Sequence, residues 1–197
     1  MMMKVRSMML AALALATAPA LAAEKAPSAA DYPDVANTSF AEPSGDRAIQ
    51  LSAVIPAPAP EVFAAFTTSE GFKSWAVGMA RIDLRVGGEI EASYNPKAQP
   101  GDPDNIRNRI DAYLPDRLMV IHNVQAPKAL PGREAFARTV TVIEFVPVDA
   151  GSTRVTVTNA GYGPGADFDA AYRHFLWGNA YTLDALKKYF AGKAKGG

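Results

Sequence analysis

Apolar and polar residues alternate along seven segments of the chain, and this alternation predicts seven β-strands. In the first segment Ile49, Leu51 and Ile55 share one side of the expected strand, and prolines at positions 56 and 58 end the pattern. The seven segments are 47–55, 82–86, 89–94, 109–114, 118–124, 140–148 and 154–160. Gly87-Gly88, between the second and third segments, predicts a tight hairpin. Short connections make the strands largely antiparallel.

Two short helices are predicted between the first and second strands. Pro60 suits the first turn of a helix because its missing N–H would have no partner there, and Glu61 interacts favourably with the helix dipole. Phe63 and Phe66 mark the face expected to be buried. Ser69 is expected to cap the second helix.

The longest helical pattern lies near the end of the chain, over 167–188 or beyond. Its core-facing positions recur at steps of three and four, and they are Phe168, Tyr172, Phe175, Leu176, Asn179, Leu183, Leu186 and Phe190. This spacing predicts one long amphipathic helix. Together with the strands, it places the protein in the α+β class.

The first 22 residues have the features of a secretory signal peptide. Lys4 and Arg6 provide a positive start, 8–18 is an apolar stretch, and a small-residue cleavage motif ends at Ala22. The apolar stretch is shorter than the ~20 residues that a bilayer requires. We therefore expect cleavage after Ala22, export to the periplasm or the medium, and no membrane anchor.

The rest of the chain is long enough for one domain, expected at 47–191. A leader at 23–46 lacks periodicity and is expected to be loosely ordered, and a disordered tail is expected at 192–197. The chain has no cysteine, so no disulfide framework is available. It has 20 basic and 20 acidic residues, and two of the basic ones lie in the signal. Without a basic surface, nucleic-acid binding is not expected.

Several motifs occur in the order found in one known superfamily. They are P-A-P-E-V-F followed by F-K-S-W at 58–75, R-V-G-G-E at 85–89, L-P-D-R-L at 114–118, G-S-T-R-V-T-V-T at 151–158, and a closing Gly-Asn, Leu, Leu, Tyr-Phe pattern at 178–190. The chain resembles START-like domains of the SRPBCC superfamily, in the branch of activators of heat-shock-protein-90 ATPase (AHSA-type domains). The resemblance implies a helix-grip fold, in which a seven-stranded antiparallel sheet wraps around the long C-terminal helix.

The resemblance also implies a cavity between the sheet and the long helix that holds a small hydrophobic or amphipathic molecule. The side chains expected to line it are Trp75, Tyr94, His122, Phe145, Tyr172, Phe175, Asn179 and Leu183. His122 and Asn179 stand where the family often has aromatic residues, so we interpret them as polar groups that orient a ligand. Two alternatives stay open: a shift of register turns His122 outward, or both residues are satisfied core groups or bind an ordered water.

Two other classes of function compete with ligand binding. In the first, a periplasmic cyclase- or hydrolase-like enzyme uses His122 as general acid or base, with Asp111 and Glu144 as further candidates. In the second, Phe145, Phe175 and Leu183 close the core, and the protein is a structural or interaction module. No nucleophile or metal-binding motif is recognised, so catalytic residues, metals and cofactors are not assigned.

Two further segments raise specific expectations. The loop at 96–105 contains Asp102-Pro103-Asp104-Asn105, which superficially resembles a calcium loop, but its prolines favour a solvated loop instead. Trp177 is expected on the outward face of the long helix. Either residues 32–40 of the leader or a second subunit covers it, or it stays partly exposed; the sequence leaves the oligomeric state open.

Overall fold

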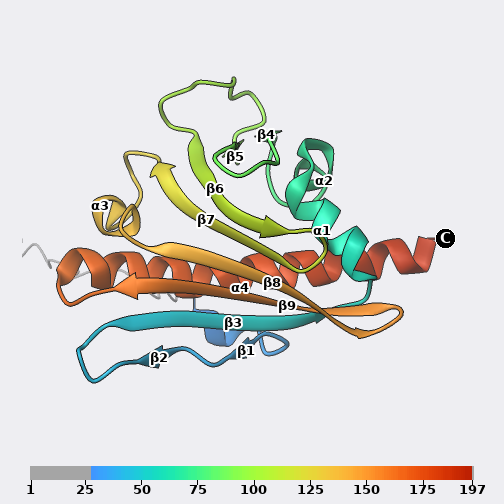
Figure 1. Cartoon of the computed structure of the whole chain (residues 1–197), viewed down its shortest axis with the longest axis horizontal. Helices are drawn as coiled ribbons and strands as arrows, with labels where there is room; N and C mark the ends of the chain where they lie inside the picture. Colours follow the sequence, from blue (N-terminus) through green and yellow to red (C-terminus); the bar gives the residue numbers. More distant parts are fainter. Residues whose placement is uncertain (1–27, 197) are drawn as a thin grey trace, which may run out of the picture.

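The computed structural model describes residues 28–196, and it consists of one curved antiparallel sheet and a long helix (Figure 1). The strands are β1 (Ala36–Asn37), β2 (Phe40–Ala41), β3 (Arg47–Ile55), β4 (Met79–Ile82), β5 (Glu89–Ser93), β6 (Ile106–Leu114), β7 (Leu118–Gln125), β8 (Val140–Asp149) and β9 (Ser152–Tyr162). Their order across the sheet is β1-β3-β9-β8-β7-β6-β5-β4, and β2 also pairs with β3. The predicted α+β helix-grip class is confirmed, with two short strands added at one edge.

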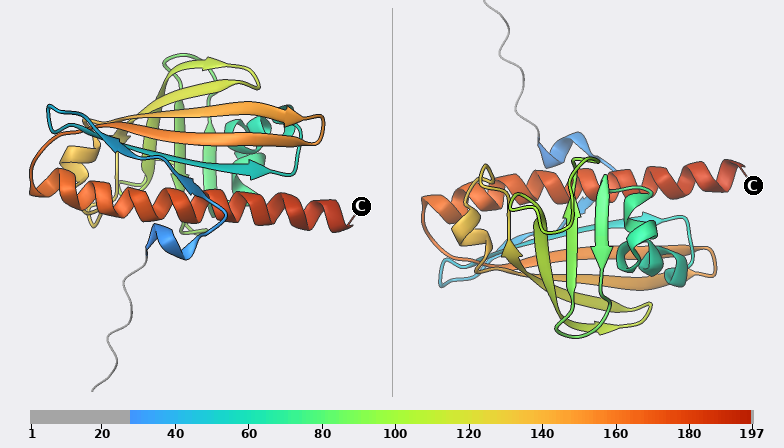
Figure 2. Two further views of the ribbon diagram at one scale, coloured as in Figure 1. Left: turned by 90° about the horizontal axis from the view of Figure 1, so that it is seen from below. Right: turned by 90° about the horizontal axis from the view of Figure 1, so that it is seen from above.

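The long helix α4 (Ala166–Gly196) packs against β3 and β9, as Figures 1 and 2 show from three sides. Leu183 and Leu186 are fully buried on it and belong to the same core cluster as the equally buried Ile49 and Leu51 of β3. Burial of such a side chain stabilises the fold by about 1.5–3 kcal/mol. The predicted stripe on this helix is therefore the inner wall of the core. The helix runs on through 192–196, where a tail was expected.

Helices α1 (Ala59–Thr67) and α2 (Ser69–Lys73) lie between β3 and β4, as predicted. Phe63 and Phe66 are buried. Ser69 is not the cap of α2, however. Thr68 has the extended backbone of a capping residue, and its Oγ1 accepts a hydrogen bond from Gly71 N at 3.0 Å. The Ser69 hydroxyl instead accepts a bond from Ile82 N at 3.0 Å and ties α2 to β4.

The strand predicted at 82–86 is wrong, because β4 ends at Ile82 and residues 83–88 form a longer connection. Val86 is 62% exposed there. Gly87 and Gly88 pair with β6 instead of forming a two-residue hairpin: Gly87 N donates to Ile110 O at 2.7 Å, and Ile110 N donates to Gly88 O at 2.9 Å. A Cβ on Gly88 would lie 2.1 Å from Asp83 O, so the close backbone approach requires glycine.

Two helical elements were not predicted, in addition to the strands β1 and β2. Helix α3 (Arg133–Phe136) lies between β7 and β8 and packs against α4. The short 3₁₀ helix η1 (Ala29–Asp31) lies on the side of α4 away from the sheet, and the chain then passes to β1 and β2 at the edge of β3 (Figure 2). Residues 28–46 are thus in contact with both the sheet and α4. The expected signal peptide at 1–22, its cleavage site and residues 23–27 lie outside the described residues.

Candidate functional site

The region beneath α1 and α2 is filled by aromatic side chains. Phe145 is fully buried, and its ring centroid lies 5.3 Å from that of Phe63 and 5.4 Å from that of Phe66. Trp75 packs edge-on against Phe66 at 5.1 Å and donates its indole N–H to Ala65 O at 3.0 Å. Phe145 and Leu183, both expected to line the cavity, are therefore core residues in this structure, and the expected lining residue Trp75 is partly buried against that core.

Two further residues of the expected lining pack against protein at the other end of α4. The Tyr172 ring meets that of Tyr162 edge-on at 5.3 Å. Phe175 stacks on Phe136 with a centroid distance of 3.9 Å. Since Phe136 belongs to α3, the unpredicted helix covers this part of the long helix.

Asn179 lies on the inner face of α4, as expected, and its partners are side chains of the sheet. Its amide donates a hydrogen bond to Asn159 Oδ1 of β9, and Asn159 in turn donates to Thr141 Oγ1 of β8 at 2.5 Å. Asn159 is only 2% exposed. The chain of hydrogen bonds satisfies these polar groups within the core, which corresponds to the alternative of satisfied core groups.

The inward direction expected for His122 is wrong. Met119 and Asn123 are the buried residues of β7, at 1% and 5% exposure, so positions of odd number face the core. His122 lies on the opposite, outer face of the sheet, where its Nδ1 is 2.7 Å from Asp111 Oδ2. A register shift between Ile110 and Ala112 marks a bulge at Asp111. Both side chains are about one third exposed.

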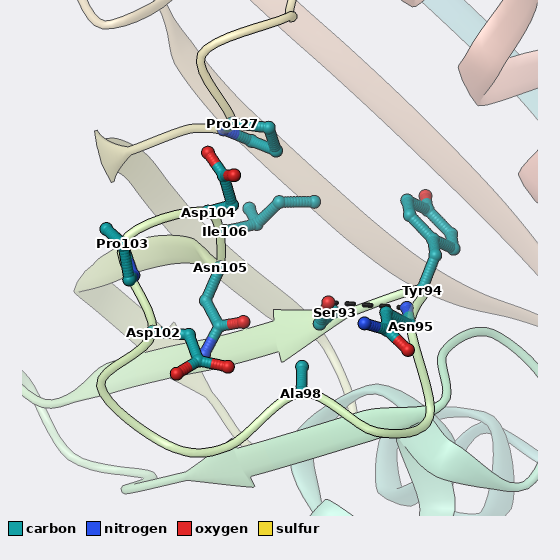
Figure 3. A pocket seen from close by; sticks show the side chains of 10 residues that line it. All are labelled: Ser93, Tyr94, Asn95, Ala98, Asp102, Pro103, Asp104, Asn105, Ile106 and Pro127. Carbon is teal, nitrogen blue, oxygen red and sulfur yellow. Dashed lines mark hydrogen bonds between the residues drawn. The ribbon is translucent and has the colours of Figure 1, made fainter.

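A pocket of about 460 Å³ opens where β5 ends and β6 begins (Figure 3). We call it the rim pocket. The lining residues that matter here are Tyr94, Ala98, Asp102, Asp104, Ile106 and Pro127. Ile106 is opposite Ala92 of β5, which is buried, so the rim pocket lies at the border of the core-facing side of the sheet. Of the eight side chains expected to line the central cavity, Tyr94 is the one that lines the rim pocket.

Buried hydrogen bonds hold the loop that forms the rim pocket. Asn105 is 1% exposed and donates to Glu91 Oε1 and to Gln99 O, both at 2.8 Å. Gln125 Nε2 donates to Asp102 O at 3.1 Å and to Asn105 O at 2.9 Å. These contacts preorganise the pocket, which lowers the entropic cost of binding.

In the sequence, the rim pocket corresponds to the polar run at 102–105, which favours a solvated loop. The run is solvated in part, since Asp104 is exposed while Asn105 is buried. Buried Asn105 and Glu91 were not among the expected site residues. A sequence pattern does not show that Asn105 turns inward, because that depends on Glu91 from a neighbouring strand.

Tyr94 forms one wall of the rim pocket and stands apart from the other lining side chains (Figure 3). Removal of water from around its hydroxyl raises the pKa of Tyr94, and Tyr181 of α4 adds to the effect. The residue is nevertheless 67% exposed, so we regard its ring as accessible and this desolvation as partial.

Other kinds of site are not indicated by the described part of the chain. Within residues 28–196, no group of three or more His, Asp or Glu side chains is arranged to hold a metal ion. In the same residues, no helix combines the length and apolar character needed to cross a membrane.

Comparison with solved structures shows the fold. The Aha1 dimer from Colwellia psychrerythraea is 20% identical with a TM-score of 0.56, and the match covers 73% of this chain and 95% of that one. A Rhodobacter sphaeroides protein is 13% identical with a TM-score of 0.61, and the match covers 82% of this chain and 99% of that one. An HSP90 activator from Plasmodium falciparum is 15% identical with a TM-score of 0.50, and the match covers 71% of this chain and 90% of that one. At these identities the likeness concerns the fold alone.

Sequence comparison identifies the family. No curated protein matches the chain. The family model described as activator of Hsp90 ATPase homolog 1-like protein matches residues 56–191, which is more than half of the chain and includes α1 to most of α4. The chain therefore belongs to the activator of Hsp90 ATPase homolog 1-like family.

Proposed function

We propose that this protein binds a small amphipathic molecule in the rim pocket. The observation that carries the proposal is a preorganised pocket of about 460 Å³ with apolar walls from Ile106 and Pro127 and polar groups from Asp102 and Asp104. Pockets for small molecules generally have about this size and this combination of walls. The site differs from the central cavity that the family resemblance implies, because Phe145 and Leu183 are core residues.

Export is the second part of the proposal. It rests on the amino-terminal sequence alone, in which Lys4 and Arg6 precede an apolar stretch and a cleavage motif. Fractionation of cells expressing the full chain, with mass spectrometry of its first residue, tests this part. We expect a periplasmic or secreted protein that begins at Ala23, and a cytosolic protein that retains Lys4 would contradict it.

Native mass spectrometry of the protein isolated from its own compartment tests ligand binding. We expect a co-purifying small molecule in the wild-type protein. In Ala98→Trp the indole occupies the rim pocket, so the bound fraction should fall at least about tenfold, equivalent to about 1.4 kcal/mol. Ala150→Trp is the matched control, because Ala150 is an exposed turn residue outside the pocket. A ligand retained equally by both variants would contradict the proposal.

One observation favours a second candidate, a hydrolase- or cyclase-like enzyme. Asp111 binds His122 Nδ1 and leaves Nε2 available, an orientation that suits a general base. Neither residue lines the rim pocket, so this candidate lacks a described place for a substrate. Hydrolysis of a panel of activated esters tests it: His122→Ala should lower turnover about 100-fold, and His174→Ala should not.

Hsp90 activation is named in the family description, and the Plasmodium falciparum protein of similar fold is itself described as an HSP90 activator. We do not extend this activity to the present chain, because the proposed export would separate the protein from a cytosolic ATPase.

A role as a structural or interaction module without a ligand would be supported instead if the native protein carried no small molecule and bound no amphipathic probe.

A further inference from the structure

We propose that the ligand of the rim pocket carries a positive charge, as an amine or a quaternary ammonium group joined to an apolar chain. The inference rests on the proposed function and adds the chemical class of the ligand. It follows from the charges of the pocket, from the way its two carboxylates are held, and from the position of an aromatic ring across the opening.

The charged side chains that line the rim pocket are all acidic. Asp102 and Asp104 belong to the lining, whereas no Lys, Arg or His side chain does. Two lysines are adjacent to lining residues. Lys97 precedes Ala98 and is not part of the lining, and Lys128 follows Pro127 and lines a separate hollow with Arg133 and Asp167. Among the lining residues, the negative charge of Asp102 and Asp104 is therefore not balanced by a positive side chain.

The two carboxylates are oriented by backbone groups rather than by cations. Asp102 Oδ2 accepts a hydrogen bond from Gln99 N at 2.8 Å, and Asp104 Oδ1 accepts one from Lys128 N at 3.3 Å. Among residues 28–196, neither aspartate forms an ion pair. An ammonium group in the pocket would supply the missing partner without displacing an existing ion pair.

An aromatic ring and an apolar floor complete the arrangement. In Figure 3, Asp104, Ile106 and Pro127 lie on one side of the opening and Tyr94 lies on the other. The face of a tyrosine ring attracts cations within about 6 Å, and the attraction is strongest for weakly hydrated ions such as quaternary ammonium. Ile106 and Pro127 provide apolar contact for the chain attached to the cation.

The same charges disfavour other amphiphiles. An anionic head group would approach Asp102 and Asp104 well within the Debye length of about 8 Å at physiological salt, so it would be repelled. A neutral head group gains no ion pair. Specificity for a cation thus arises from repulsion of the wrong ligand as well as attraction of the right one.

Three probes with the same decyl chain test the inference by isothermal titration calorimetry below their micelle concentrations. They are decyltrimethylammonium, decyl maltoside and decyl sulfate. We expect the cation to bind about tenfold more tightly than the neutral probe, and the sulfate to bind more weakly than both. Asp104→Asn should reduce the preference for the cation over the neutral probe about fivefold.

Asp116→Asn is the matched control, since it removes the same charge at the turn between β6 and β7, at the far end of β6 from the pocket. It should leave the preference unchanged. Tyr94→Leu should reduce the preference about threefold, whereas Tyr94→Phe retains the ring and should keep it.

The outcomes separate the two proposals. If the neutral probe binds and the cation has no advantage, or if Asp104→Asn and Asp116→Asn behave alike, the inference about charge is overturned and the proposed function stands. If none of the three probes binds, the proposed function fails and the inference fails with it. Preference for the cation that depends on Asp104 and on the Tyr94 ring supports both.

Discussion

The amide of Asn179 in α4 donates a hydrogen bond to the side-chain oxygen of Asn159 in β9, and this contact links the long helix to the buried face of the sheet. Asn159 is 2% exposed, so water does not replace a lost partner easily. A residue expected to bind a ligand is engaged with the protein itself. The contact therefore has consequences for stability that can be measured.

Asn179→Leu should destabilise the protein by about 1–3 kcal/mol, because the Asn159 oxygen would remain buried without its partner. Urea denaturation measures this loss as a lower midpoint at constant slope. Thr182→Ala is a suitable control, since Thr182 Oγ1 donates its hydrogen bond to Gly178 O of its own helix, and loss of this bond should cost less than about 0.5 kcal/mol. Equal losses in the two variants would argue against a special role for Asn179.

His122→Gln should change the free energy of unfolding by less than about 1 kcal/mol, because the pair with Asp111 is partly exposed on the outer face. Binding of decyl maltoside should be unaffected, since His122 does not line the rim pocket. The two measurements are urea denaturation and calorimetry. Loss of binding in this variant would show that the outer face contributes to the ligand site.

Tyr162→Phe should leave stability unchanged or raise it by up to about 1 kcal/mol. Tyr162 is fully buried, and its hydroxyl has no hydrogen-bond partner among the described residues. The mutation removes an unsatisfied group and keeps the ring packed on Tyr172. Tyr172→Phe, at a half-buried position, provides the comparison. A loss above 1 kcal/mol in Tyr162→Phe would reveal a partner for the hydroxyl.

Tyr162 should also make the stability of the protein depend on pH in the alkaline range. Burial first, and Tyr172 second, raise the pKa of Tyr162 above its ordinary value of about 10. The unfolded chain then loses this proton at a lower pH than the folded chain, so Tyr162 favours unfolding as the pH rises above 10. Stability at pH 11 relative to pH 9 should fall less in Tyr162→Phe than in the wild type, which urea denaturation at both values checks.

Gly132→Ala should destabilise the protein by more than about 2 kcal/mol. Gly132 has a φ of 64°, and a Cβ there would lie 2.2 Å from Asp167 O and 2.7 Å from Ala171 N, both backbone atoms of α4. Gly45 has a similar φ of 90° with open space around it, so Gly45→Ala should cost only the backbone strain of about 1 kcal/mol. Thermal denaturation of both variants separates the effect of the steric contact from the effect of backbone strain. Equal losses of stability in the two variants would contradict the close packing of α3 on α4.

Tyr32→Ala should increase the quenching of Trp177 fluorescence by acrylamide. The Tyr32 ring packs edge-on against Tyr181 at 6.2 Å, and Tyr181 stacks on Trp177 at 6.0 Å. Asp34 holds the same segment to Lys187 by an ion pair of 2.9 Å. Loss of the Tyr32 ring should free Tyr181 to move and expose the indole.

The quenching experiment uses a Trp75→Phe background, so that Trp177 is the single emitter. Ser39→Ala, which lies in the same amino-terminal segment between β1 and β2, is the control, and it should leave quenching unchanged. Equal quenching with and without the Tyr32 ring would indicate that something other than the leader covers Trp177, and analytical ultracentrifugation would then test a second subunit.

Strand β7 has apolar residues at four consecutive positions. Leu118, Val120, Met119 and Ile121 are all apolar, so both sets of alternate positions could face the core. The structure selects the set with Met119, which is 1% exposed, and this choice turns His122 outward. Side chains of a strand alternate between its two faces. When the neighbouring elements determine which face of β7 is buried, they therefore determine the direction of every side chain in the strand.

The sequence by itself determined the α+β class, the long C-terminal helix, the position of α1 and α2, and most of the strands. These features depend on local periodicity, and short-range contacts encode them. Only the tertiary structure decided which face of β7 is buried, that Phe145 and Leu183 close the core, and that a pocket opens at 94–106. Those outcomes depend on contacts between residues that are separated in the chain, such as Glu91 with Asn105 and Phe136 with Phe175. Local sequence patterns do not predict such contacts.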